Sequence, residues 1–156
     1  MSNLKIMNRK QYLDYLKENP DTTCQFCDYN SRQIVLKETK SWVWIANLAP
    51  YWKWHTMFIP KSHIEKIEEL KLEEFEELSE LKNYAEKTYK EKINPLLEDL
   101  IYMFFYFWRE REDGFDPHSN IKKPTHLHLH MVPERDGLMN KIVDPDASDF
   151  DYTKFL

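Results

Sequence analysis

The stretch of sequence that decides the fold is Thr125-His-Leu-His-Leu-His-Met-Val-Pro133, in a chain of 156 residues. Its histidines, His126, His128 and His130, alternate with apolar residues. This alternation is typical of a β-strand with one imidazole face and one apolar face. At roughly 3.3 Å per residue, the first and third histidines stand about 13 Å apart, so one ion cannot bind all three unless the strand bends. The spacing therefore predicts a different task for each end of the row.

The segments around this stretch predict an α+β fold, in which helices pack on an antiparallel sheet of about five strands. Asn8 and Gln11 have the spacing of a capping box, which predicts a helix over about residues 8–19. Apolar runs bounded by turn residues predict further strands at Ile34–Glu38, Trp42–Asn47, His55–Pro60 and Leu100–Trp108.

A long helix is predicted between Ile64 and Tyr89, where apolar residues recur every three to four positions before Pro95. Its other positions are mostly Glu and Lys, which is typical of a solvated helix face. Leu100–Trp108 is a continuous apolar run, and such a run predicts a strand buried on both faces. Its aromatic residues would pack either in the core or against another subunit.

Length and composition predict one domain over residues 1–156, with the motifs between 24 and 133 and a tail over 134–156. The net charge of −5 argues against broad binding to nucleic acid or anionic lipid, but it allows a local site for a small phosphorylated ligand. We expect a cytoplasmic protein with no membrane span, because no apolar run is long enough and the polar start resembles no signal peptide. The two glycines, Gly114 and Gly137, exclude a glycine-rich phosphate loop.

Two cysteines occur as Cys24-Gln-Phe-Cys27. In a reducing compartment, this spacing indicates a metal site or a redox pair rather than a structural disulfide. His63 and His126 complete a set of two thiolates and two imidazoles, which suits tetrahedral zinc. Because these residues are spread more widely than any zinc-finger spacing, a zinc ion here would tie the N-terminal turn to the sheet and have a structural role.

Three segments of the chain resemble motifs of the histidine-triad (HIT) superfamily of nucleotide hydrolases and transferases. Cys24-Gln-Phe-Cys27 is similar to the N-terminal zinc knuckle of many members. His55-Thr-Met-Phe-Ile-Pro-Lys-Ser-His63 is similar to the segment Gly-His-Thr-Leu-Val-Ile-Pro-Lys-x-His. The row from His126 to Val132 matches the triad itself, and the three segments follow in the family's order.

The resemblance implies a role for each end of the histidine row. His128 would be the nucleophile that attacks an α-phosphorus and forms a nucleotidyl-histidine. His130 would hydrogen-bond the phosphate or the bridging oxygen. His55 would support the triad from the adjacent strand. His126 would bind zinc with the two cysteines and His63.

The resemblance also implies the ligands and the assembly. Family members cleave dinucleoside polyphosphates, nucleoside phosphoramidates or sugar nucleotides, and a homodimer is expected. Asn47 stands where the family places an Asp or Asn that contacts ribose hydroxyls, although it could be an ordinary strand-end asparagine. Ile45 and Leu48 could line the base pocket or pack in the core.

The chain departs from the family pattern at two places. Trp54 replaces the glycine before His55. The family's Gly-Gln-Ser/Thr stretch before the triad is replaced by Asn120-Ile-Lys-Lys-Pro-Thr125. Phosphate contacts would then come from side chains, for which Lys122, Lys123 and Arg109 are candidates, although both lysines could simply be solvated in a loop.

Three functional hypotheses follow. The first is an enzyme acting through His128, and the second is a zinc-stabilised nucleotide-binding or interaction module with little turnover. The third, a catalytic metal on His128 and His130, lacks an obvious third ligand. His118 has no counterpart in the triad and is expected at the surface.

Overall fold

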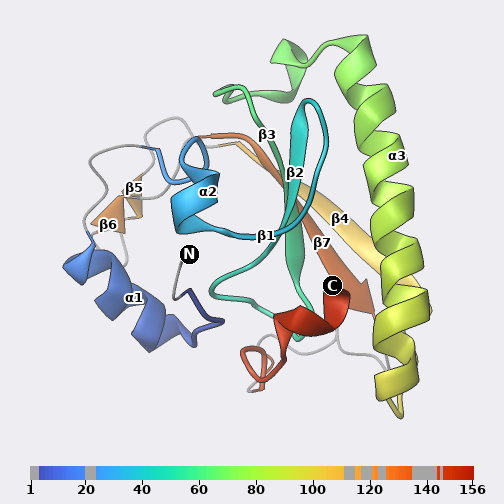
Figure 1. Ribbon diagram of the computed structural model, residues 1–156. Helices are drawn as coiled ribbons and strands as arrows, with labels where there is room; N and C mark the ends of the chain where they lie inside the picture. Colours follow the sequence, from blue (N-terminus) through green and yellow to red (C-terminus); the bar gives the residue numbers. More distant parts are fainter. Residues whose placement is uncertain are drawn as a thin grey trace.

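The computed structural model describes residues 4–19, 24–110, 115–116, 121–122, 126–134, 144 and 146–156. Its main sheet is antiparallel and five-stranded, in the order β1-β2-β3-β7-β4 (Figure 1). The bounds of these strands, in that order, are Ile34–Glu38, Trp42–Ala46, Thr56–Pro60, His128–Glu134 and Met103–Arg109. The predicted α+β class and sheet are therefore confirmed.

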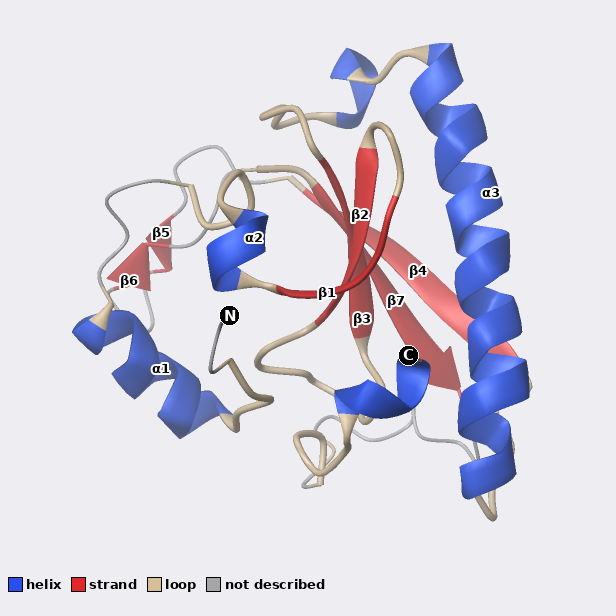
Figure 2. Ribbon diagram, viewed as in Figure 1, coloured by secondary structure: helices blue, strands red, loops and turns tan. Residues whose placement is uncertain are grey.

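The remaining elements are helices, short turns and a small hairpin (Figure 2). The α-helices are α1 (Arg9–Glu18), α2 (Tyr29–Arg32) and α3 (Leu72–Thr88). A π-helical turn at Tyr89–Ile93 continues α3, and 3₁₀ turns lie at Ile67–Glu69, Asn94–Leu96 and Tyr152–Phe155. β5 (Phe115–Asp116) pairs with β6 (Ile121–Lys122) in a two-stranded antiparallel sheet. No helix among the described residues is long and apolar enough to cross a membrane.

The capping box predicted for α1 is present. Asn8 Oδ1 accepts the backbone N–H of Gln11 at 2.9 Å, and Gln11 Oε1 accepts the N–H of Asn8 at 2.9 Å. The predicted start of the long helix is wrong, since α3 begins only at Leu72. Ile64 instead accepts the N–H of Leu127 through its carbonyl at 2.7 Å, which holds this segment against the chain entering β7.

The two faces of the sheet bury different residues. α3 lies along one face, where Leu127, Leu129 and Met131 join its apolar core (Figure 1). The histidines that alternate with these residues face the other side, where Phe26 contacts the rings of His126 and His128. The period-two alternation therefore has the predicted result, with one apolar face and one imidazole face.

Burial of Leu100–Trp108 on both faces was predicted wrongly. β4 begins at Met103 and lies at the edge of the sheet, with β7 as its strand neighbour. Leu100, Tyr102 and Met103 are 58%, 66% and 43% exposed, and the rest of β4 is half-buried. The apolar run predicted a strand correctly, but the position of the strand in the sheet decides how much of it is covered.

Candidate functional site

The three histidines of the row lie next to one another at the start of β7. His126 precedes the strand, and His128 and His130 belong to it. Their exposed fractions are 0%, 5% and 2%. Burial lowers the pKa of His126 to about 4, so this imidazole is neutral at pH 7.

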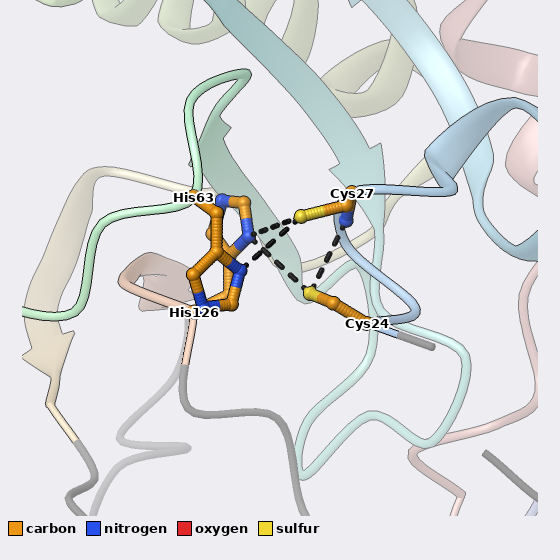
Figure 3. A group of neighbouring side chains, drawn as sticks. All are labelled: Cys24, Cys27, His63 and His126. Carbon is orange, nitrogen blue, oxygen red and sulfur yellow. Dashed lines mark hydrogen bonds between the residues drawn. The ribbon is translucent and has the colours of Figure 1, made fainter. Parts of the chain in front are cut away.

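At one end of the row, four side chains converge on a single point (Figure 3). Nδ1 of His126 lies 3.4 Å from Cys24 Sγ and 3.5 Å from Cys27 Sγ, and Nδ1 of His63 lies 3.2 Å from Cys27 Sγ. All four ligand atoms lie within 4.8 Å of one another. The edges of a tetrahedral zinc site measure roughly 3.3–3.8 Å, so this donor set fits such an ion.

A backbone carbonyl sets the tautomer that His126 needs to bind a metal ion. The Nε2–H of His126 donates to the carbonyl of Pro60 at 2.7 Å, so the lone pair lies on Nδ1, the atom that faces the sulfurs. Desolvation, followed by the neighbouring Cys24 thiol, raises the pKa of Cys27 to about 11, so a bound cation is needed to keep the Cys27 sulfur as a thiolate at neutral pH. Three separate segments meet here, as the sequence predicted.

At the other end of the row, His128 has the opposite tautomer. Its Nδ1–H donates to the carbonyl of His126 at 3.0 Å, which places the lone pair on Nε2. A ring nitrogen of this kind is a nucleophile at neutral pH.

The tautomer of His130 is set by its hydrogen bond with His55. The backbone N–H of Tyr51 donates to Nδ1 of His55 at 3.2 Å, so the proton of His55 lies on Nε2. That N–H points at Nδ1 of His130, 2.8 Å away, and His130 therefore carries its own proton on Nε2. Burial, together with the charges of His128 and Arg109, lowers the pKa of His55 to about 3. His55 is therefore a neutral donor throughout the physiological range.

Aromatic rings hold His130 in place. Its ring stacks on Phe107 at 4.4 Å between centroids and on Tyr51 at 5.9 Å. The guanidinium of Arg109 lies 5.8 Å from the Phe107 ring centroid and 5.9 Å from that of Tyr51. Arg109 also faces His128 across the β4–β7 pair. A permanent positive charge thus lies beside the two histidines, where an anion would be stabilised.

Asn47 follows β2 and is buried beside His55. Its Nδ2 lies 3.4 Å from both ring nitrogens of His55, and its Oδ1 accepts the N–H of Ala49 at 2.9 Å. The structure therefore brings Asn47 and Arg109 to the site. Only the backbone of Lys122 is described, in β6, and Lys123 lies outside the described residues.

A pocket opens in front of His128 and His130. Its wall comes from the end of β2, from α1 and from the cysteine turn, and the lining residues are Arg9, Tyr12, Gln25, Phe26, Gln33, Asn47, Leu48, Ala49, Tyr51 and Met57. Leu48 thus lines the pocket, whereas Ile45 packs in a core cluster with Phe26 and Met57.

Sequence reasoning missed the polar wall of this pocket. Tyr12 donates to Oε1 of Gln25 at 3.3 Å, and Gln33 donates to the same oxygen at 3.5 Å. Gln25 lies inside the Cys-x-x-Cys motif, and that position could have indicated its place beside the site. No sequence pattern indicated that Tyr51, Phe107 or the α1 residues lie beside the site.

The HIT domain family model matches residues 29–137. A comparison with curated protein sequences finds no match. Among solved structures, an ADP-glucose phosphorylase from Arabidopsis thaliana with bound ADP-glucose is 20% identical, with a TM-score of 0.57. A galt-like protein from the same plant is 23% identical, with a TM-score of 0.53.

The chain covers only 35% and 37% of these two plant proteins, which in turn match 77% and 78% of this chain. A zinc-bound histidine triad family protein from Mycobacterium smegmatis is similar over 81% of this chain and 86% of its own, with 20% identity and a TM-score of 0.57. At these identities, the likeness shows a shared fold.

Proposed function

We propose, because the chain belongs to the HIT domain family, that it is an enzyme that cleaves or transfers a nucleoside monophosphate group through His128. The observation that carries the proposal is the hydrogen bond from Nδ1 of His128 to the carbonyl of His126 at 3.0 Å. It leaves the lone pair on Nε2, in a side chain that lines the pocket together with His130. Arg109, across the strand pair from His128, would add positive charge for a phosphate bound there.

In the first step, Nε2 of His128 attacks the α-phosphorus, and the bond from phosphorus to the leaving oxygen or nitrogen breaks. The positive charge that develops on the ring is stabilised by the carbonyl of His126, which accepts the Nδ1–H. The Nε2–H of His130 donates to the phosphate or to the leaving atom. In the second step, water or another acceptor attacks phosphorus and gives its proton to solvent or to the released leaving group, and the P–N bond breaks to restore neutral His128.

The pocket supports a nucleoside as the other part of the substrate. Asn47 offers both a donor and an acceptor for ribose hydroxyls, and Leu48 offers an apolar contact for a base. The ADP-glucose bound to the similar plant phosphorylase supports nucleotide sugars and dinucleoside polyphosphates as candidate substrates. Lys122 and Lys123 would add positive charge from the preceding loop.

We also propose that Cys24, Cys27, His63 and His126 hold a structural zinc ion. The donor set and its spacing support this assignment, as does the zinc-bound neighbour of similar fold. The ion would fix the cysteine turn to the start of β7 and would thereby hold His126, whose carbonyl orients His128. One domain over residues 1–156 and a homodimer through the exposed start of β4 complete the proposal.

The test is to trap the covalent intermediate. The protein is incubated with ADP-glucose, diadenosine tetraphosphate or adenosine 5′-phosphoramidate, quenched in base and weighed by mass spectrometry. We expect an adenylyl adduct that is absent in His128→Asn and retained in His118→Asn, whose histidine is predicted at the surface. Nucleotide binding without an adduct or turnover would instead identify a nucleotide-binding module.

A further inference from the structure

A chain of buried hydrogen bonds runs behind His55, on the side of the sheet covered by α3. The indole N–H of Trp44 donates to Oγ1 of Thr56 at 2.8 Å. Oγ1 of Thr56 lies 3.1 Å from the hydroxyl of Tyr89, which in turn donates to the backbone carbonyl of Trp54. Thr56 and Tyr89 are fully buried, and Trp44 and Trp54 nearly so. This series of hydrogen bonds is therefore closed to water.

Only one arrangement of protons satisfies this chain. An indole can only donate, and a backbone carbonyl can only accept. Tyr89 has one hydroxyl proton, and it goes to the Trp54 carbonyl. The proton of Thr56 must therefore go to the Tyr89 oxygen. Because each member has a single role, removing one hydroxyl leaves a buried group without its partner, and that is costly in a site closed to water.

The series of hydrogen bonds ends at the carbonyl of Trp54, a residue with a strained backbone. Trp54 has a φ of 67°, in the left-handed region that favours glycine and is a true outlier for a bulky side chain. Such a conformation costs about 1–3 kcal/mol and persists only when its surroundings determine it. The Trp54 ring packs on Phe150 at 5.0 Å and on Phe155 at 5.5 Å. These contacts hold the Trp54 side chain in place and so help to maintain the strained backbone.

The peptide between Trp54 and His55 is held at both of its polar groups. Its carbonyl accepts from Tyr89, and its N–H donates to the carbonyl of Trp52 at 3.3 Å. The plane of this peptide sets the direction in which His55 leaves the backbone. His55 in turn points its Nε2–H at His130. A single peptide, Trp54–His55, therefore lies between the Tyr89 hydroxyl and the histidine pair.

Tyr89 reaches this carbonyl from an irregular turn. It is the first residue of the π-helical turn Tyr89–Ile93, which follows α3. Its ring is wedged between Phe104 at 5.0 Å and Phe155 at 5.1 Å. π-turns are rare and frequently occur at functional sites.

We propose that Tyr89 is a positioning residue for the histidine pair. Through the Trp54 carbonyl, it holds His55 at the angle that keeps the proton of His130 on Nε2. The effect on turnover rests on the function proposed above, whereas the effect on the proton position of the two histidines does not.

The first test is Tyr89→Phe, which removes the hydroxyl and keeps the ring. We expect kcat to fall roughly tenfold with KM nearly unchanged, as is typical when a group that orients a functional histidine is lost. We also expect the ring ¹⁵N shifts of His55 and His130 to move toward a mixture of tautomers. The matched control is Tyr106→Phe. Tyr106 donates to Glu86 of α3 and does not touch Trp54, so kcat and the histidine spectrum should stay unchanged.

The second test uses the preceding link of the chain. Thr56→Val removes the hydroxyl and should reproduce the spectrum and the kcat of Tyr89→Phe, whereas Thr56→Ser keeps the hydroxyl and should restore both. If Tyr89→Phe or Thr56→Val folds with the wild-type histidine spectrum, the positioning role is refuted. An equal loss of kcat in Tyr106→Phe would refute it too. Absence of turnover in the wild type would overturn the proposed function alone, because the spectra still decide the role of Tyr89.

Discussion

His126 and His128 stand two residues apart on the same face of the sheet, yet they hold their protons on opposite ring nitrogens. His126 donates through Nε2 to the carbonyl of Pro60, and His128 donates through Nδ1 to the carbonyl of His126. The first histidine therefore presents Nδ1 to two sulfurs, and the second presents Nε2 to a pocket. The carbonyl within reach of each ring, rather than the residue type, selects the chemistry.

The residues around the His126 end and the His128 end of the row favour ligands of opposite charge. Cys24 and Cys27 offer two sulfur ligands beside two imidazoles, so the His126 end favours a metal ion. Arg109 places a positive guanidinium beside the other end of the row, so the His128 end favours an anion. The same strand can serve both ends because its residues alternate between the core and the site. If the two ends are separate sites, a substitution at one end should leave the other end intact.

The largest effect is expected at the nucleophile. His128→Asn removes the atom that would bond to phosphorus, so turnover should fall by at least roughly 10³-fold. Zinc content, measured by elemental analysis, should stay the same as in the wild type, since His128 is not among the four clustered ligands. A variant that loses zinc together with activity would show that the two ends are not separable.

The next effect is expected at the metal end. Cys24→Ser removes one of four ligands, and we expect loss of zinc and a fall in the thermal midpoint on the order of 10 °C. Calorimetry with and without added chelator measures this effect, and the chelator should lower the midpoint of the wild type but not of the variant. At a temperature where Cys24→Ser is folded, His128 should still form the adduct. A chelator-insensitive wild type would refute the structural role of the ion.

The sequence predicted those features of the site that depend on residues close together along the chain. The alternation around His128 and the spacing of Cys24 and Cys27 are local patterns. The structure places the histidines on one face of the sheet and brings the cysteines to His63 and His126, as predicted. A place for Asn47 in the site was expected only through the resemblance to the family, and its contact with His55 was not predicted. A sequence pattern of a few residues can therefore identify ligand types and the face of a strand.

The features that the sequence did not predict depend on contacts between segments that are distant along the chain. Tyr89 has the spacing of an apolar helix position, and nothing in that spacing reports that a π-turn carries its hydroxyl to the Trp54 carbonyl. The exposure of Tyr102 depends on the order of strands in the sheet, which the apolar run does not encode. The departure at Trp54 was visible in the sequence. Its positive φ, however, became evident only with the backbone.

A smaller effect concerns pH and the neutral state of His55. The folded protein keeps this imidazole unprotonated down to a pKa of about 3, whereas the unfolded chain takes up a proton near pH 6.5. The unfolded state thus binds more protons between these values, so stability is full above pH 6.5 and falls as the pH drops through this window. The expected loss from His55 is up to about 1.4 kcal/mol per pH unit. Urea unfolding at several pH values should give a shallower dependence for His55→Asn, and equal slopes would contradict the prediction.

The smallest effect should fall on the charge beside His128. Arg109→Gln keeps a polar side chain and removes the guanidinium 5.9 Å from the Tyr51 ring centroid, so affinity for AMP should fall roughly three- to tenfold. Lys123→Gln is the matched comparison for the loop that replaces the family's glycine-containing segment. If the loop contributes a phosphate ligand, calorimetric titration with AMP will show a comparable loss for Lys123→Gln; if its lysines are only solvated, the loss will be confined to Arg109→Gln. Zinc content should not change in either variant, because neither residue is among the four clustered ligands. An Arg109→Gln variant with wild-type affinity would mean that His130 and the backbone alone hold the phosphate, and the division of charge between the two ends would then lose its main support.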